Sequence, residues 1–304
     1  MTSSDIKWPK KTHEYQSHHV DSTIWNDFKF RDDDIIISTY AKSGTTWTQQ
    51  IISQLLFDGA EGIPAAEMSP WVDMRIPPKE VKLPVLEEQT HRRFLKTHLP
   101  VDALVLSPKA KYIYIARDGR DVAWSFHNHH INANEAYYDA VNNSPGRVGP
   151  PFERPTDDVV EYFREFVEKD GYPFWPFWEN IRTWWEVRDL PNVLLLHFAD
   201  MKADMPGTIR TIAAFLEIPI NEEKWPAILE HCSFDYMKAN AEATVPLNGA
   251  LWEGGATTFI NKGTNGRWKD MLTEVDNKWY EAEARKQLGE ECADWLTNGS
   301  RAGR

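Results

Sequence analysis

A run of residues between positions 35 and 47 contains the side chains that a bound anion would need. Apolar residues 35–37 predict a buried strand, and the periodic apolar residues of 47–57 predict a helix. The turn between them contains Lys42, Ser43, Gly44, Thr45 and Thr46. At such a turn, free backbone N–H groups and the positive end of the helix dipole point at one spot, and the lysine adds a charge. We therefore expect a phosphate, or a close analogue of phosphate, to bind here.

The order of residues in this turn differs from that of the common phosphate-binding loop. In the pattern G-x-x-x-x-G-K-[ST], the lysine directly follows the second glycine. Here Lys42 precedes Gly44, and the turn has no other glycine. Taken alone, the turn is equally consistent with an ordinary strand-to-helix connection that carries a surface lysine. The choice between these interpretations depends on the rest of the chain.

Polar side chains also follow two other predicted strands. Residues 92–98 predict a short strand that ends at Lys96 and His98, and residues 111–117 predict a buried strand that ends at Arg117. Strands that alternate with helices indicate an α/β fold, in which a central parallel sheet is flanked by helices. Ligands of such sheets bind beyond the carboxyl ends of the strands. If the three strands are neighbours, their polar ends converge on one site.

The remaining segments complete one predicted domain that spans residues 1–304. A fourth buried strand is expected at 192–198. Helices are expected at 46–57, 119–131, 157–169, 177–188, 205–217, 222–231 and 274–297. Residues 1–30 are expected to be an irregular lead-in, and 59–90 is expected to be mostly loop with short helices because it contains five prolines. Residues 132–156 are rich in Asn, Gly and Pro and are expected to form a long mobile loop.

The composition excludes several classes of protein. A formal net charge of −12 over 304 residues argues against a general binder of nucleic acids or of anionic membranes. The two cysteines, Cys232 and Cys292, form no disulfide framework and no metal-ligand spacing, so we expect no metal site and a reducing, cytoplasmic setting. The first thirty residues contain no apolar core of a signal peptide, and no apolar run is long enough to span a bilayer.

Four segments, taken together, resemble the cytosolic sulfotransferase family. They are YAKSGTTW at 40–47, FLKTHLP at 94–100, ARDGRDVAWS at 116–125 and NKGTNGRWKD at 261–270. The resemblance runs in order through most of the chain and implies the family's P-loop-like sulfotransferase fold, in a member of bacterial type. It also implies that the chain transfers a sulfuryl group from 3′-phosphoadenosine 5′-phosphosulfate (PAPS), without a metal, and releases 3′,5′-bisphosphoadenosine (PAP).

The resemblance implies a role for each polar residue at the strand ends. Lys42 would contact the bridging and leaving oxygen of the donor, and Lys96 would help to neutralise the sulfuryl group. His98 would be the general base that takes the proton from the acceptor, a role typically worth about 10²–10⁴-fold in rate. The other donor contacts fall into three sets. The 5′-phosphate would be held at Ser43, Gly44, Thr45 and Thr46, the 3′-phosphate by Arg117, Ser125, Asn261, Lys262 and Gly263, and the adenine by Trp47, Phe198 and Phe234.

Three residues depart from the family's pattern. Asn261 stands where the family usually has an arginine, which removes a charge from the expected 3′-phosphate clamp. Phe198 stands where a tyrosine is frequent and Cys232 where a threonine is common, so each position loses a hydroxyl near the adenine. The family's C-terminal dimer motif is only half present, at Lys269 and Thr273, so the oligomeric state is left open.

The acceptor side is less specified by the sequence. The segment 171–185 is dense in aromatic residues and fits either a ligand pocket or a helix–sheet core. His127, His129 and His130 lack metal-ligand spacing, so they are expected at the surface or against the acceptor. The aromatic residues favour a small hydrophobic acceptor, such as a phenol or a steroid-like or lipid-like alcohol. The resemblance implies that the acceptor group is a hydroxyl, with an amine in second place.

Two alternatives stay open on the sequence alone. A P-loop nucleotide kinase would use ATP and Mg²⁺, but it would need the Gly-Lys order that this chain lacks. The second alternative is a nucleotide-binding protein that has lost catalysis, and Asn261 is its support. The presence of Lys42, Lys96 and His98 favours an enzyme over such a protein.

Overall fold

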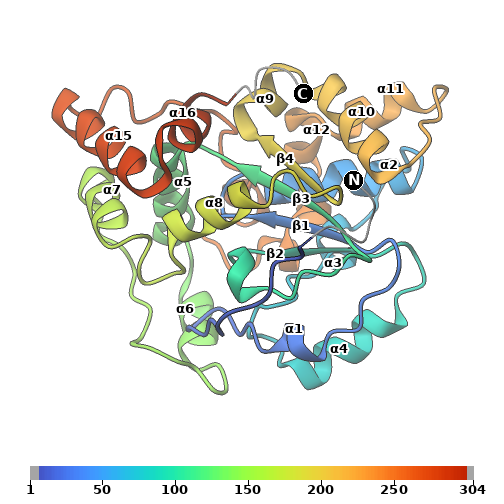
Figure 1. Cartoon of the computed structure of the whole chain (residues 1–304), viewed down its shortest axis with the longest axis horizontal. Helices are drawn as coiled ribbons and strands as arrows, with labels where there is room; N and C mark the ends of the chain where they lie inside the picture. The colour runs from blue at the N-terminus through green and yellow to red at the C-terminus, as the bar shows by residue number, and fades with distance from the viewer. Residues whose placement is uncertain (1–6, 300–304) are drawn as a thin grey trace.

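A four-stranded parallel sheet forms the centre of the structure, a computed structural model that describes residues 7–299 (Figure 1). The strands lie in the order β2-β1-β3-β4, with the bounds β1 Ile35–Thr39, β2 Phe94–Thr97, β3 Lys111–Ala116 and β4 Val193–His197. The register places Ile36 of β1 between Leu95 of β2 and Tyr112 of β3. The predicted α/β fold with a central parallel sheet is therefore confirmed.

Successive residues of the strands face opposite sides of the sheet, and both sides are buried. Ile35 and Ile37 of β1 belong to one hydrophobic cluster, and Ile36 belongs to the other. In β3, Tyr112 lies in the cluster of Ile36, and Ile113 lies in the cluster of Ile37. Because neither face meets water, the strands read as nearly continuous apolar runs.

The helices divide between the two faces of the sheet (Figure 1). The face of Ile35 is covered by α2 Thr45–Leu56, α9 Phe198–Ala203, α10 Met205–Leu216 and α11 Trp225–His231. The face of Ile36 is covered by α5 Gly119–Ile131, α7 Val159–Glu168, α8 Phe177–Glu186, α15 Glu274–Leu288 and α16 Glu290–Asn298. The other helices are α1 Ile24–Asp27, α3 Ala65–Met68, α4 Lys79–Glu88, α6 Glu135–Asn142, α12 Phe234–Ala239, α13 Ala241–Thr244, α14 Ala256–Phe259 and the 3₁₀ helices η2 Val101–Ala103 and η3 Pro246–Gly249. Within residues 7–299, no helix combines the length and the apolar character needed to cross a membrane.

The segment 132–156 differs from the long loop that the sequence predicts. It contains α6, and Tyr137, Val141 and Phe152 within it are buried in the core. The side chain of Asn134 begins this helix by accepting a hydrogen bond from the backbone N–H of Tyr137. The loop prediction was wrong for Glu135–Asn142 because a segment rich in Asn, Gly and Pro can still form a helix when its few large apolar side chains are buried.

Other predicted boundaries need smaller changes. The helix predicted at 274–297 is two helices, α15 and α16, separated at Gly289, whose φ is 76°. The segment 59–90 is mostly loop with two short helices, α3 and α4, as predicted, and Pro84 lies inside α4. From residue 7 to residue 30 the lead-in is irregular apart from α1, and the first six residues of that prediction lie outside the described part of the chain.

A buried ion pair joins the beginnings of β1 and β2. Asp34 directly precedes β1, and Arg93 directly precedes β2. The Arg93 guanidinium donates to both carboxylate oxygens of Asp34, with a distance of 2.8 Å from Nε to Oδ1. Each side chain is only 1% exposed, so neither charge could be solvated if its partner were removed.

We expect Asp34→Asn to lower the free energy of unfolding by about 3–5 kcal/mol, because it leaves the guanidinium of Arg93 buried without a counter-charge. Urea denaturation followed by circular dichroism measures this change. The control is Glu274→Gln, which breaks an exposed ion pair with Lys278 on α15 and should leave the unfolding midpoint unchanged. Equal midpoints for the two variants would contradict the importance given to the Asp34–Arg93 pair.

Candidate active site

The polar ends of β1, β2 and β3 meet at one cavity of about 840 Å³. Because β1 lies between β2 and β3, Lys42, Lys96, His98 and Arg117 reach the same edge of the sheet, and the predicted convergence is confirmed. The predicted site residues that line the cavity are Lys42, Gly44, Thr45, Thr46, Trp47, Lys96, His98, Arg117, Ser125, Phe198, Phe234, Asn261, Lys262 and Gly263. Ser43 does not line it: its side chain is fully buried, and its hydroxyl has no hydrogen-bond partner.

The turn after β1 has a backbone that keeps the beginning of α2 open to the cavity. Gly44 precedes α2 with a φ of 107°, a left-handed conformation that favours glycine. A Cβ at Gly44 would lie 2.8 Å from the ring of Phe198, so a larger residue does not fit. Lys42 also has a positive φ, 70°, which is uncommon for a residue with a side chain and occurs often at functional sites. The first backbone N–H groups of α2 have no partner within the helix and can hold an anion.

His98 is held in one orientation by the residues around its ring. Its Nδ1 lies 2.8 Å from the carbonyl oxygen of Thr39, an acceptor, so Nδ1 carries the proton and Nε2 is the basic nitrogen. The ring stacks on Trp175 at 5.4 Å between centroids and meets the edge of Trp71 at 4.7 Å. The side chain of Thr39 also hydrogen-bonds to that of Thr45, which ties the position of His98 to the start of α2.

Burial keeps His98 neutral. Together with the nearby charge of Lys96, it lowers the pKa of His98 to about 3. An ordinary histidine has a pKa near neutrality, and the difference arises because burial and the charges of two lysines disfavour the imidazolium. A neutral imidazole can accept a proton, and negative charge placed near the two lysines would raise its pKa.

Lys42 and Lys96, the two lysines at the strand ends, are partly buried, and neither forms an ion pair with a carboxylate among the described residues. Burial, followed by the charges of Arg117 and Lys96, lowers the pKa of Lys42 to about 7. Burial also lowers the pKa of Lys96 to about 8. The Nζ of Lys42 lies 3.1 Å from Nδ1 of His129 and 4.7 Å from the ring centroid of Phe259. An anion in the cavity would favour the charged form of both lysines.

Arg117 connects the turn after β1 with the segment 261–270. Its guanidinium donates to the carbonyl oxygen of Lys42 at 2.9 Å, to the carbonyl oxygen of Thr264 at 3.0 Å and to the side chain of Asn265 at 3.1 Å. The side chain is 7% exposed and lies over the ring of Phe198. A guanidinium has five N–H groups, so two are left after these bonds.

Three aromatic rings lie where the adenine contacts are predicted. Trp47 donates from Nε1 to the carbonyl oxygen of Cys232 at 2.8 Å and meets the ring of Phe198 edge-on. Phe234 is 39% exposed, and a Cβ at Gly263 would lie 2.6 Å from its ring, so the absence of a side chain there permits the close approach. All three rings line the cavity, which is compatible with a flat base between Trp47 and Phe234.

The apolar part of the cavity wall comes largely from segments that the sequence analysis did not connect with the site. Trp252 and Phe259 belong to the stretch around η3 and α14, and Trp71 precedes α4. Only the three-dimensional fold brings these segments together, so no local pattern reveals them. The additional apolar and aromatic residues of the wall include Met74, Ile76, Phe126, Tyr137, Val141, Phe174, Trp175, Leu247 and Leu251.

The open questions about the acceptor side are partly answered. In the aromatic segment 171–185, Phe174 and Trp175 line the cavity. The rings of Phe177, Trp178, Trp184 and Trp185 belong to the core, and Tyr172 is exposed. His129 and His130 also line the cavity, as one of the two expectations has it. His127 does not line it and instead bonds from Nε2 to the carbonyl oxygen of Thr156.

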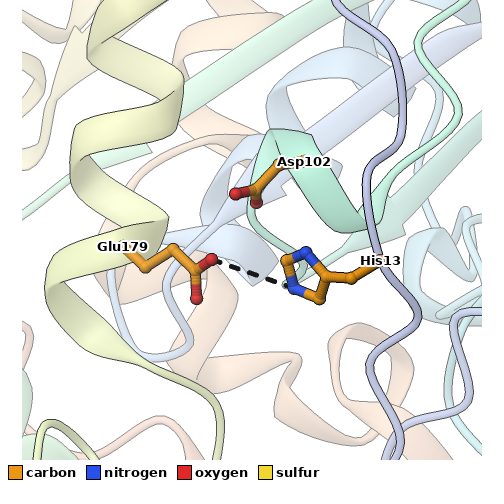
Figure 2. A group of neighbouring side chains, drawn as sticks. All are labelled: His13, Asp102 and Glu179. Carbon is orange, nitrogen blue, oxygen red and sulfur yellow. Dashed lines mark ion pairs between the residues drawn. The ribbon is translucent and has the colours of Figure 1, made fainter.

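One group of potential metal ligands lies outside the cavity lining, at His13, Asp102 and Glu179 (Figure 2). Figure 2 shows that the three side chains come from the lead-in, η2 and α8. One ligand atom of each lies within 4.8 Å of the others, and burial together with the charge of Asp102 raises the pKa of Glu179 to about 6. No local sequence pattern reveals this group, because its members are far apart in the chain. The group could hold a cation, but it takes no part in the cavity.

The comparisons with known proteins agree with this architecture. Residues 32–290 match the sulfotransferase domain family. A protein of Mycobacterium tuberculosis named glycolipid sulfotransferase is 32% identical over 309 residues, which cover 94% of each chain. Sulfotransferase 1A1 of Rattus norvegicus is also 32% identical, over 84% of each chain.

Solved structures have the same fold. Mouse sulfotransferase SULT7A1 complexed with PAP superposes with a TM-score of 0.69 at 23% identity, over 91% of this chain and 93% of that chain. Retinol dehydratase in a complex with retinol and PAP superposes with a TM-score of 0.68 at 26% identity, over 92% of this chain and 86% of that chain. The predicted sulfotransferase fold is therefore confirmed.

The low pKa values of Lys42 and Lys96 predict that PAP binds more weakly at high pH. Both lysines would have to be protonated to neutralise PAP, so its binding would take up protons once the pH exceeds about 7 for Lys42 and about 8 for Lys96. We expect the Kd to rise by about tenfold or more between pH 7 and pH 9, since one pKa unit corresponds to a factor of ten. The phosphates change their ionisation little in this range, because their second pKa is about 6.

Isothermal titration calorimetry at several pH values measures this dependence. The proton uptake is read from the enthalpies in buffers with different heats of ionisation. Lys42→Arg, which stays charged throughout, should show a smaller dependence on pH. A Kd that is constant from pH 7 to pH 9 would mean that neither lysine titrates with the ligand.

Proposed function

The chain belongs to the sulfotransferase family, and we propose that it transfers a sulfuryl group from PAPS to a hydroxyl group of a small hydrophobic acceptor. The observation that carries this proposal is the convergence of Lys42, Lys96, His98 and Arg117 on one cavity at the ends of three adjacent strands. The choice of donor is supported by the solved structures of the same fold that contain PAP.

The donor would occupy the part of the cavity between α2 and the segment 261–267. Backbone N–H groups at the start of α2, with Thr45 and Thr46, would hold the 5′-phosphate. The 3′-phosphate would bind the free N–H groups of Arg117 and the hydroxyl of Ser125, with Asn261, Lys262 and Gly263 beside it. The adenine would lie between Trp47 and Phe234, with Phe198 at its edge.

The transfer itself would be an in-line displacement at sulfur. The acceptor oxygen forms a bond to sulfur while the bond from sulfur to the bridging phosphate oxygen breaks, and PAP leaves. Lys42 would stabilise the charge that develops on the leaving oxygen, and Lys96 would neutralise the sulfuryl oxygens. Nε2 of His98 would take the proton of the acceptor hydroxyl, because Nδ1 is already engaged with Thr39. In this mechanism the two lysines, rather than a metal ion, would stabilise the negative charge of the transition state.

The acceptor would lie against the aromatic wall near Trp71, Phe174, Trp175, Trp252 and Phe259. Large flat rings around a few polar groups are typical of sites for hydrophobic small molecules. The named activities and ligands of the relatives are in keeping with such an acceptor, since they include a glycolipid sulfotransferase and structures with retinol or androsterone. We therefore favour a steroid-like or lipid-like alcohol or a phenol, with an amine in second place.

The direct test is the transfer of labelled sulfate from PAPS to a panel of phenols, steroids, long-chain alcohols and amines. We expect turnover on at least one member, and His98→Ala should lower kcat by about 10²–10⁴-fold while it leaves the Kd of PAP nearly unchanged. His13→Ala, a histidine outside the cavity lining, serves as the matched control.

Each failure of this test has a distinct meaning. A His98→Ala enzyme with wild-type kcat at saturating substrates would remove His98 from the role of base. Thermal unfolding with added nucleotide tests the kinase alternative, since a ligand at 100 times its Kd raises the free energy of unfolding by about 2.7 kcal/mol. Stabilisation of the folded protein by ATP and Mg²⁺ but not by PAP would favour a kinase. Tight PAP binding with no turnover on any acceptor would favour the nucleotide-binding protein without catalysis.

A further inference from the structure

Arg267 differs from the other arginines of the chain in its surroundings. Among residues 7–299, it is the arginine that forms no hydrogen bond and no ion pair, whereas every other described arginine binds a carboxylate, a carbonyl oxygen or a side-chain amide. Its side chain is partly buried and lines the cavity. In a protein with a net charge of −12, an unpaired arginine at a cavity indicates an anion-binding position.

The segment that carries Arg267 is fixed over Arg117. The carbonyl oxygen of Thr264 and the side chain of Asn265 accept hydrogen bonds from the Arg117 guanidinium. The backbone N–H of Gly266 donates to a carboxylate oxygen of Asp121 at 2.7 Å. These three contacts come just before Arg267 in the chain, so they hold its backbone beside Arg117.

Arg267 and Arg117 are close enough for their charges to interact. Burial lowers the pKa of Arg117, the carboxylates of Asp121 and Asp118 oppose this effect, and the positive charge of Arg267 adds to it. Two guanidinium groups without an anion between them repel each other, and a bound dianion would remove that repulsion. Arg117 has only two N–H groups left, fewer than a phosphate with three terminal oxygens can accept.

The neighbouring position 261 lacks the charge that the sulfotransferase pattern leads one to expect. Asn261 is neutral, and its backbone carbonyl accepts a hydrogen bond from Lys238. Lys262 is exposed at the rim of the cavity. The clamp would therefore have one strong bidentate cation, Arg117, where two are expected.

From this geometry we infer that Arg267 binds the 3′-phosphate of the donor together with Arg117 and takes the place of the arginine missing at position 261. This inference rests on the proposed function, because it assumes an adenosine donor with a 3′-phosphate. It makes Arg267, with Arg117, a residue by which this chain distinguishes such a donor from one without the 3′-phosphate. The departure at Asn261 is then compensated within the same segment.

The test compares two nucleotides and four proteins by isothermal titration calorimetry. The ligands are PAP and adenosine 5′-monophosphate, which lacks the 3′-phosphate. Arg267→Gln should weaken PAP binding by about 10- to 100-fold, the value of a charge-assisted hydrogen bond, and should change binding of the monophosphate little. The control is Arg182→Gln, which breaks an exposed ion pair on α8 away from the cavity lining and should bind both ligands like the wild type.

The fourth protein is the double variant Asn261→Arg with Arg267→Gln. It should recover PAP affinity to within a few-fold of the wild type, because the charge returns to the clamp from the other position. Since Arg267 has no partner in the fold, the unfolding midpoint of Arg267→Gln should match that of the wild type, and a structural role would lower it.

The outcomes separate this inference from the proposed function. An unchanged Kd for PAP in Arg267→Gln, or an equal loss for both nucleotides, would overturn the role of Arg267 while the donor assignment stands. A wild-type protein that does not prefer PAP over the monophosphate would overturn the donor assignment and, with it, the role of Arg267.

Discussion

The buried guanidinium of Arg117 joins the parts of the chain that make the site. It holds the carbonyl oxygen of Lys42 after β1 and the residues Thr264 and Asn265, which lie 75 to 148 positions from it in the chain. A buried charge is costly unless it is hydrogen-bonded, so these three contacts offset much of the cost of burying the guanidinium. The end of β3 that carries Arg117 is fixed by the sheet, and Asp118 directly after it caps α5. The positions of the turn and of the segment around Thr264 therefore depend on this one side chain.

The electrostatics of the cavity follow from the same arrangement. The sheet brings Lys42, Lys96 and Arg117 to one edge, and burial lowers the pKa of each. Lys42 contacts His129 rather than a carboxylate, although the chain as a whole is acidic. The protein thus contains a cluster of cations that are costly to keep charged without an anion. A donor with two phosphates and a sulfuryl group would supply that anion, and its charge would raise the pKa of His98 towards a value suited to a base.

Much of the fold could be predicted from local patterns. Strand β3 and helix α5 were predicted within one residue of their bounds, because their signals lie within a few positions of the sequence. The signal for β3 is a short apolar run, and the signals for α5 are the capping residue Asp118 and the periodic apolar residues that follow it. The site residues at the strand ends also followed from local sequence, once a parallel sheet was inferred. Helix α6 was missed because it is stabilised by contacts of Tyr137 and Phe152 with the core, which the local composition does not reveal.

Contacts between distant segments could not be predicted. The stacking of Trp175 on His98 joins a helix-preceding turn to a strand end, and the aromatic wall at Trp252 and Phe259 comes from a stretch with little regular pattern. The position of Arg267 depends on the fold of the loop that binds Arg117.

The most direct test is the Kd of PAP for the wild type and for Arg117→Ala, measured by calorimetry on protein whose unfolding midpoint is known. We expect one PAP per chain and an affinity at least about 30-fold weaker in Arg117→Ala. Equal affinities in the two folded proteins would mean that Arg117 does not bind the donor.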